Sequence, residues 1–327
     1  MDAFVRSVTA AFGLGAVEDV AVQPMAGSAN RVWRFDTPAG AFVVKELSHD
    51  TPEHLVPRRR AAAFEMRVFD HGIIAMAEPV PAEDGEIVVP LEGSRDHVCA
   101  VRVHRWLDGS KITSPEPDML RAAGASLHAI QHAGTAWSSA PTGSIRWWDV
   151  EPAEVADRLL RSPSLGRLGQ EATALVPDAL AIVAAADRLA GAWVFSHCDH
   201  KPENALAVDG APAVLDWDDC GHCHPRLEAV EAALRWSGRP EPRRAPFDAF
   251  LTGYSDAGGD IERLSERDFG KWLAALLGWF SLQARRALGE WSADTEAERW
   301  AAHAMAADAL VQLRDSLAHL STWATWR

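Results

Sequence analysis

The sequence has no long apolar segment. None of its 327 residues belongs to a run approaching the ~18 consecutive apolar residues of a membrane-spanning helix. Residues 1–7 also lack the basic region followed by an apolar run that is typical of a secretory signal peptide. We therefore expect a cytoplasmic protein that has no membrane partner.

The sequence has few cysteines, and its basic residues are outnumbered by its acidic ones. Without an export signal, the four cysteines are expected to be free thiols rather than a disulfide framework. The formal net charge of −14 argues against a nucleic-acid partner, whose phosphates need a basic surface. The acidic surface permits a cationic substrate, and it fits a merely soluble protein equally well.

The remaining composition is that of a globular protein long enough for two lobes with real cores, and it shows no internal repeat. Apolar alternation and turn residues predict a strand-rich N-terminal lobe over residues 1–107. The strands are expected at 17–25, 31–35, 41–45, 86–89 and 97–103, with a helix at 57–70.

The sequence pattern changes after residue 107. Apolar residues recur at helical spacing through residues 108–327, which predicts a larger helical lobe that also carries the catalytic stretch. Its helices are expected at 117–132, 153–161, 171–190, 227–236, 247–254, 268–288 and 295–320. The predicted fold class is α+β, with a small antiparallel lobe followed by a helical one.

The most informative motif reads His-x-Asp-x-x-x-x-Asn and is followed, after an apolar strand, by another Asp. Its residues are His197, Asp199, Asn204 and Asp216. Kinase-type phosphoryl transfer uses an Asp to orient the acceptor hydroxyl, then an Asn and a second Asp to hold metal. Any one of these residues alone could be a turn or cap residue, but several types at fixed spacing make chance an unsatisfactory explanation.

These residue types suggest particular roles. Asp199 is the candidate catalytic base, and its positioning matters more than its base strength because the transition state is loose. Asn204 and Asp216 are candidate ligands of Mg²⁺, a hard ion that prefers oxygen, with Asp218 as a further candidate. His197 is expected to bond backbone groups and hold Asp199 in place.

Two lysines are candidates for contact with the phosphates. Lys201 follows Asp199 by two residues and could reach the transferring phosphate, although a solvated loop lysine fits as well. Lys45 ends an apolar strand, from which it can project over the α- and β-phosphates. Glu65, on the helix at 57–70, is the acid expected to pair with Lys45.

Two further patterns carry weaker signals. The small residues around Ser28 let backbone N–H groups approach a phosphate, but a plain hairpin turn explains them equally well. Cys220-Gly221-His222-Cys223-His224 matches the haem-attachment pattern, which requires an oxidising compartment that the chain gives no sign of entering. A zinc site is an alternative to it. A second ligand pair at suitable spacing is not evident, and coincidence is the favoured interpretation.

Together these motifs resemble the aminoglycoside phosphotransferase and choline kinase family, a branch of the protein-kinase-like fold. The likeness extends over most of the chain, and its motifs are residues 27–34, Lys45, Glu65, 104–109, 127–128, 197–204 and 216–218. It implies two lobes, a small-molecule hydroxyl as acceptor, and ATP or GTP as donor. It also implies that Ser28 contacts phosphate and that backbone groups near Arg105 and Leu107 read the purine.

The chain departs from the usual family pattern at several positions. Cys198 stands where glycine is common, Asp218 where glycine is common, and His224 where aspartate is common. These changes leave the transfer chemistry intact and leave the acceptor open. No Ala-Pro-Glu element follows Asp216, so protein-kinase activity is not favoured despite Lys201.

We therefore expect an ATP- or GTP-dependent O-phosphotransferase that uses Mg²⁺, acts on an antibiotic of the aminoglycoside, nucleoside or peptide type, and confers resistance. The alanine-, arginine- and tryptophan-rich, lysine-poor composition suggests a high-GC, actinomycete-like source, where antibiotic producers protect themselves in this way. The alternatives are a metabolic kinase for choline, a sugar or a homoserine-like acceptor, and a nucleotide-binding pseudokinase. Acceptor contacts are expected in residues 134–157 and on helices after Asp216, in a monomer or homodimer.

Overall fold

The computed structural model divides the chain into two compact units, each discontinuous in sequence. It describes residues 2–25, 30–47, 52–94, 98–137, 165–189, 191–238, 241–290 and 295–326. Unit 1 comprises Met1–Pro115, Ala129–Thr142 and Val194–His222, and unit 2 comprises Glu116–His128, Gly143–Trp193 and Cys223–Arg327. The expected boundary after residue 107 follows chain order, whereas the predicted catalytic motif clusters with the N-terminal strands in unit 1.

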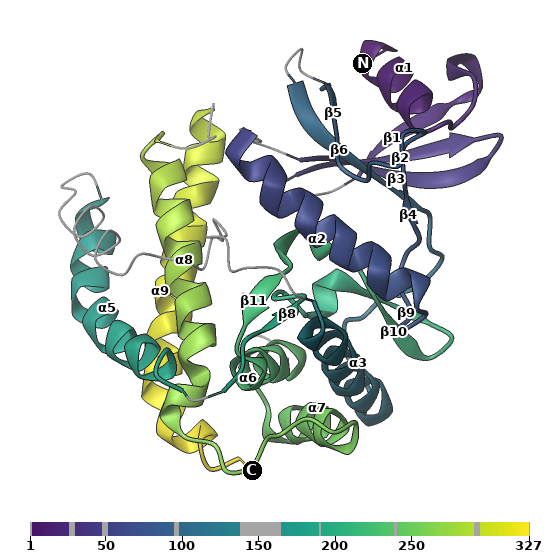
Figure 1. The fold of residues 1–327 in the computed structure, drawn as a ribbon. Coiled ribbons are helices and arrows are strands. Elements are labelled where there is room, and N and C mark those ends of the chain that lie inside the picture. Colours follow the sequence, from purple (N-terminus) through teal and green to yellow (C-terminus); the bar gives the residue numbers. More distant parts are fainter. Residues whose placement is uncertain are drawn as a thin grey trace. The chain divides into compact units, whose positions relative to one another are not determined.

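Unit 1 is built on an antiparallel sheet in the order β1-β2-β3-β6-β4, with β5 also paired to β6 (Figure 1). Its strands are β1 (Ala21–Met25), β2 (Arg31–Thr37), β3 (Gly40–Leu47), β4 (Pro79–Val80), β5 (Val89–Glu92) and β6 (Val98–Arg105). The expected turn between β2 and β3 is present. Gly40 has φ +123°, a conformation that favours glycine. The strand expected at 86–89 begins only at Val89.

The two faces of this sheet differ because successive side chains on a strand point to opposite sides. Phe35, Val44 and Val103 join a buried cluster with α1 (Asp2–Ala11). Residues in the alternate positions of β3 and β6 face the other way, and the register pairs Lys45 with Arg102. The sheet therefore has an apolar face beneath α1 and a face that carries charged side chains.

Helix α2 (Pro52–Asp70) connects the sheet to the catalytic elements of unit 1. It starts earlier than the expected residue 57, because a proline at a first helical position needs no N–H partner. Phe64 is fully buried, with its ring 5.0 Å from that of Phe195 and 6.3 Å from that of Trp217. This packing fixes the face of α2 that also carries Glu65.

The rest of unit 1 consists of short elements around the catalytic motif. They are β7 (Ser110–Lys111), β8 (Val194–Ser196), η3 (Pro202–Asn204), β9 (Ala205–Val208), β10 (Ala211–Val214), η4 (Trp217–Asp219) and β11 (Gly221–Cys223). Strands β9 and β10 form a hairpin whose turn residues, Asp209 and Gly210, both have positive φ. Such a turn matches the twist of the strands it joins, and β7 extends the hairpin to three strands.

Unit 2 is helical. Its described helices include α5 (Gly166–Ala186), α6 (Pro225–Trp236), α7 (Arg244–Asp256), η5 (Glu266–Phe269), α8 (Gly270–Ala287) and α9 (Glu296–Trp323). Helices α8 and α9 run side by side, joined by a bond of 2.8 Å from Trp272 Nε1 to Ser316 Oγ (Figure 1). The capping box of Thr295 and Glu298 fixes the start of α9. The helix expected at 153–161 lies outside the described residues.

Helix α5 packs against α8 and α9. Among the described helices it alone is long and apolar enough to cross a membrane, and length and composition by themselves are weak evidence for that. Gly270 lies where α8 approaches α5, and a Cβ there would stand 2.3 Å from the Cβ of Ala186.

Gly134 is expected to be intolerant of substitution. It lies near the end of α3 (Pro117–Thr135), and a Cβ at this position would stand 1.7 Å from the carbonyl oxygen of Phe195 in β8. Gly134→Ala must displace backbone and should lower the free energy of unfolding by about 3 kcal/mol. Gly72→Ala is the control, because φ there is +58° but the space is open, so about 1 kcal/mol is expected. Denaturant unfolding of both variants measures the difference, and an equal cost would contradict the steric argument.

Candidate active site

The Asp199 loop is held by hydrogen bonds within the motif itself. The buried ring of His197 accepts from the Asp199 backbone N–H at 3.3 Å through Nδ1, and its Nε2 lies 2.9 Å from the Leu215 carbonyl oxygen. Nε2 is then the protonated nitrogen. The Asn204 amide donates to the Asp199 carboxylate at 2.8 Å and to its carbonyl at 3.0 Å. As expected, His197 supports the loop through backbone groups.

Cys198 occupies a strained position between His197 and Asp199. Its φ is +65°, in the left-handed region that glycine enters without cost. This conformation gives a physical reason for the glycine that is common here. The buried thiol of Cys198 donates to the Gly221 carbonyl at 3.3 Å, which fixes the side chain within unit 1.

Lys201 lies against the candidate base. Its ammonium group is 2.6 Å from Asp199 Oδ2, and its side chain keeps 22% of its surface exposed. A charge-assisted bond of this kind holds the carboxylate in one orientation. Its contact with a transferring phosphate stays a prediction.

The β9–β10 hairpin brings Asn204 and Asp216 to the same end of unit 1. The register pairs Ala205 with Val214, and the Leu215 N–H donates to the Asn204 carbonyl at 2.8 Å. Because the Asn204 Nδ2 is committed to Asp199, its Oδ1 is the atom left for a ligand. The Asp216 side chain is 44% exposed, and φ at Asp216 is +60°. An amide and a carboxylate oxygen on one rigid hairpin fit a hard divalent cation.

Lys45 lies between two carboxylates of the following loop. Its ammonium group contacts both Asp216 and Asp218. Burial opposes the charge of Lys45, but the two carboxylates outweigh burial and raise the pKa of its ammonium group above the ordinary value. Burial would likewise raise the pKa of Asp218, yet Lys45 and Arg102 hold it well below the usual range. Both groups are therefore charged at neutral pH.

The expected ion pair between Lys45 and Glu65 was wrong. Glu65 instead contacts the guanidinium of Arg102, and its Oε1 lies 2.9 Å from His104 Nε2. Arg102 also reaches Asp218. The physical reason is that three side chains on one sheet face compete for the Glu65 carboxylate, and Lys45 is satisfied by the Asp residues.

The contacts of Arg102 and His104 with Glu65 were missed by the sequence reasoning. Both residues lie in β6, paired with Lys45 and Val43 of β3. The signal was present, because alternation along a strand places residues 102 and 104 on one face. An arginine inside an apolar run such as residues 98–103 is unusual unless it has a charged partner, which is the signal that marks Arg102.

His104 should make stability depend on pH. Burial and the charge of Arg102 lower the pKa of His104 to about 3, against 6.5 for an exposed histidine. The unfolded chain then binds a proton below pH 6.5 while the folded chain does not, so stability is full above pH 6.5 and falls as the pH drops toward 3. The slope should approach about 1.4 kcal/mol per pH unit. The charges surrounding the ring are those of Glu65, Lys45, Arg102, Asp216 and Asp218.

Urea unfolding between pH 7 and pH 4.5 measures this dependence. His104→Gln removes the titrating group and should flatten the slope. The exposed His71 offers a control, because His71→Gln should leave the slope as it is in the wild type. A slope that His104→Gln does not change would contradict the prediction.

The structure places the remaining predicted residues as follows. The Arg105 N–H donates to the Glu78 carbonyl at 2.9 Å, so that N–H is occupied by a backbone partner. Leu107 follows the end of β6 and is partly buried, and its part in purine binding stays a prediction. Ser28 lies outside the described residues.

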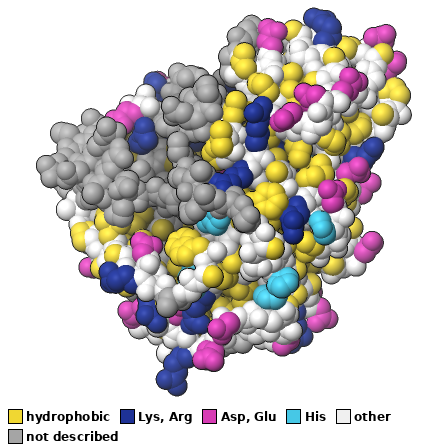
Figure 2. Space-filling view, viewed as in Figure 1, with side chains coloured by type: hydrophobic (Ala, Val, Ile, Leu, Met, Phe, Trp, Pro, Cys, Tyr) yellow, Lys and Arg dark blue, Asp and Glu magenta, His cyan; other side chains and the backbone are white. Residues whose placement is uncertain are grey.

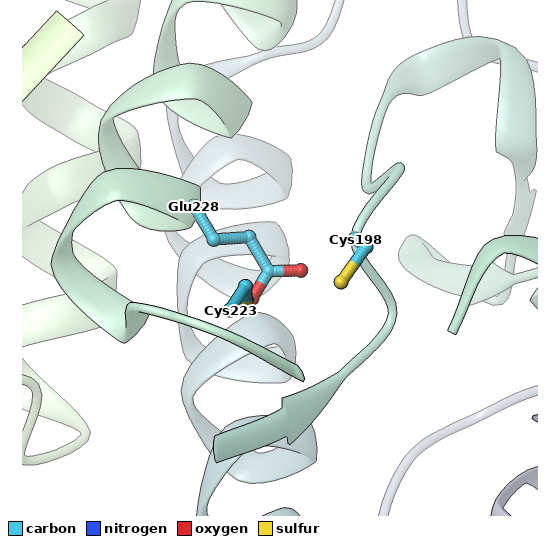
Figure 3. Close-up of side chains that lie close together, drawn as sticks. All are labelled: Cys198, Cys223 and Glu228. Carbon is cyan, nitrogen blue, oxygen red and sulfur yellow. The ribbon is translucent and has the colours of Figure 1, made fainter. Parts of the chain in front are cut away.

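All four cysteines are buried free thiols, as expected. In unit 2, the thiol of Cys223 donates to the Glu228 carboxylate at 3.2 Å, and Figure 3 shows this pair. Acidic and basic side chains are interspersed among apolar ones over the described surface on the face in Figure 2.

Comparisons with known proteins identify the family of this chain. Residues 21–267 match the model of the phosphotransferase enzyme family, APH. The chain belongs to this family. No curated protein matches it significantly.

Three solved structures share the fold across nearly the whole chain. The spectinomycin phosphotransferase bound to ADP and spectinomycin is 11% identical, with a TM-score of 0.67 over 94% of this chain and 95% of that one. The amicoumacin kinase with AMP-PNP and Ca²⁺ is 14% identical, with a TM-score of 0.66 over 94% and 91%. A microcompartment-associated aminopropanol kinase is 16% identical, with a TM-score of 0.68 over 97% of each chain.

These findings confirm the resemblance and the two-part protein-kinase-like fold class expected from the sequence. They also confirm an enzyme that transfers a phosphoryl group to an alcohol on a small molecule.

Proposed function

We propose that this protein is a Mg²⁺-dependent kinase that uses ATP or GTP to phosphorylate a hydroxyl of a small-molecule antibiotic, and so confers resistance in the cytoplasm. One observation carries the proposal. Asn204 donates to the Asp199 carboxylate, the backbone bond from Leu215 to Asn204 brings the neighbouring Asp216 to the same end of the hairpin, and Lys45 contacts the Asp216 carboxylate. A kinase needs a base, two oxygen ligands and a phosphate-binding cation in this proximity.

Each residue of the site has a separate role in the proposed phosphoryl transfer. Asp199 accepts a hydrogen bond from the acceptor hydroxyl and takes its proton late, as the oxygen forms a bond to the γ-phosphorus and the bond from that phosphorus to the β-phosphate oxygen breaks. Asn204 and Lys201 hold the Asp199 carboxylate in one orientation. Positioning of this kind supplies much of the rate when the transition state is loose.

Asn204 and Asp216 would hold Mg²⁺, with the buried Asp218 beside them. The ion would neutralise phosphate charge as the leaving group departs. Lys45 contributes a fixed positive charge at the same place, because its raised pKa keeps it protonated across the physiological range.

The antibiotic acceptor is supported by the spectinomycin and amicoumacin enzymes among the structural relatives. The aminopropanol kinase supports the second candidate, a metabolic kinase, with a similar TM-score. A pseudokinase is disfavoured, because Lys45, Asp199, Asn204 and Asp216 are all present and a pseudokinase usually loses one of them.

Mass spectrometry tests the proposal. Purified protein is incubated with Mg²⁺, ATP and GTP, and a panel of antibiotics and hydroxyl metabolites. We expect one antibiotic to gain a single phosphoryl group. A phosphorylated amino alcohol or sugar instead would favour the metabolic kinase. Nucleotide binding with neither transfer nor slow hydrolysis would favour the pseudokinase.

A further inference from the structure

Arg102 is a buried arginine with two carboxylate partners from distant parts of the chain. Only 1% of its side chain is exposed. One end of the guanidinium contacts Glu65 of α2, and the other contacts Asp218 of η4. An arginine in this environment costs much to bury unless both ends are paired. It therefore joins β6, α2 and the loop after Asp216 within unit 1.

The two cations of this cluster have separate tasks. Lys45 and Arg102 share three carboxylates, those of Glu65, Asp216 and Asp218. Because Arg102 takes Glu65 and one oxygen of Asp218, Lys45 stays on the side of Asp216, where the metal and phosphates would bind.

Additional contacts hold the Asp218 end of this bridge. Arg58 of α2 donates to the Asp218 backbone carbonyl at 3.2 Å. Trp217, next to Asp218, packs on Phe64, which precedes Glu65 in α2. Arg102 is the side chain that contacts both carboxylates, so its loss would leave Glu65 held to β6 by His104 and Asp218 held to the sheet by Lys45, with no described residue joining the two.

We propose that Arg102 is a positioning residue for phosphoryl transfer. It pairs with the α2 glutamate in place of Lys45, and it thereby holds Lys45 and the Asp216–Asp218 loop in the positions that bind the metal–nucleotide complex. This inference rests on the proposed function, because it assigns a role within the same site.

Arg102→Lys tests the proposal with the charge retained. A lysine has one compact ammonium group and cannot span both carboxylates as the guanidinium fork does. Calorimetric titration with ATP should show at least tenfold weaker binding in the presence of Mg²⁺, and a smaller change in EDTA. The melting temperature reports any purely structural effect separately.

Arg226→Lys is the matched control. Arg226 forms a similar pair with the buried Asp268, at 2.6 Å, within unit 2. This variant should lower the melting temperature and leave the affinity for Mg·ATP within twofold of the wild type. If Arg102→Lys behaves like this control, Arg102 is only structural and the proposal is overturned.

Glu65→Gln keeps the proposal testable if Arg102→Lys does not fold. This variant removes the charge of Glu65, one of the two carboxylate partners of the Arg102 guanidinium, with little change in side-chain shape. It should also weaken Mg·ATP binding at least tenfold. A folded Glu65→Gln protein with wild-type affinity would overturn the proposal. Wild-type protein that binds no Mg·nucleotide would overturn the proposed function as well, whereas an active wild type with unaffected variants would overturn only the role of Arg102.

Discussion

Asp199→Ala should lower kcat by about 10²–10⁴-fold, the contribution that a positioned general base usually makes. Asp199 is buried and is oriented by Asn204 and Lys201, so water is not expected to replace its carboxylate in the same geometry. Nucleotide affinity should change little, because the proposed donor contacts are made by Lys45, Asn204 and Asp216. Steady-state kinetics with the acceptor identified by mass spectrometry measure kcat, and titration with Mg·ATP measures affinity.

The β9–β10 hairpin provides a control for Asp199→Ala. Asp209 is exposed at the β9–β10 turn with φ +50°, so Asp209→Gly removes a carboxylate without backbone strain. It should retain wild-type kcat. If Asp199→Ala keeps kcat within about tenfold of the wild type, Asp199 is not the base.

Asp216→Asn should weaken Mg²⁺-dependent nucleotide binding by at least about tenfold, which corresponds to 1.4 kcal/mol. Two effects act together. The variant loses an anionic oxygen that a hard cation prefers, and it removes one of the two carboxylates that hold Lys45. Lys45 would then lie closer to Asp218, away from the phosphates.

Titration of each protein with ATP at several Mg²⁺ concentrations separates these effects from misfolding. The wild type should bind more tightly as Mg²⁺ rises, and Asp216→Asn should lose most of that dependence. Asp209→Asn is the matched control, since asparagine tolerates the left-handed conformation at that turn. An unchanged Mg²⁺ dependence in Asp216→Asn would remove Asp216 from the metal site.

Local sequence determined much of the catalytic hairpin. Asp209-Gly210 between two short apolar strands specifies a tight turn, and that turn sets the register that brings Asn204 beside Leu215. The spacing from Asp199 to Asn204 is also short enough for one amide to reach the carboxylate. These contacts depend on neighbours in the chain, so a motif can predict them.

The partner of Glu65 was decided by tertiary structure. Lys45, Arg102 and His104 all lie on one face of the sheet, and alternation along the strands predicts that much. Which cation reaches the acid depends on how α2 and η4 pack on that face. Phe64 and Trp217 set that packing from positions 153 residues apart.

The sequence by itself therefore determined the fold class, many of the strands and helices, and the spacing of the predicted phosphoryl-transfer motif, because each depends on local spacing and periodicity. Only the tertiary structure decided that Arg102 bridges Glu65 and Asp218 while Lys45 lies between Asp216 and Asp218. Pairing among buried charges is a competition between side chains brought together from four distant segments. Its outcome follows from their three-dimensional positions and desolvation rather than from any local pattern.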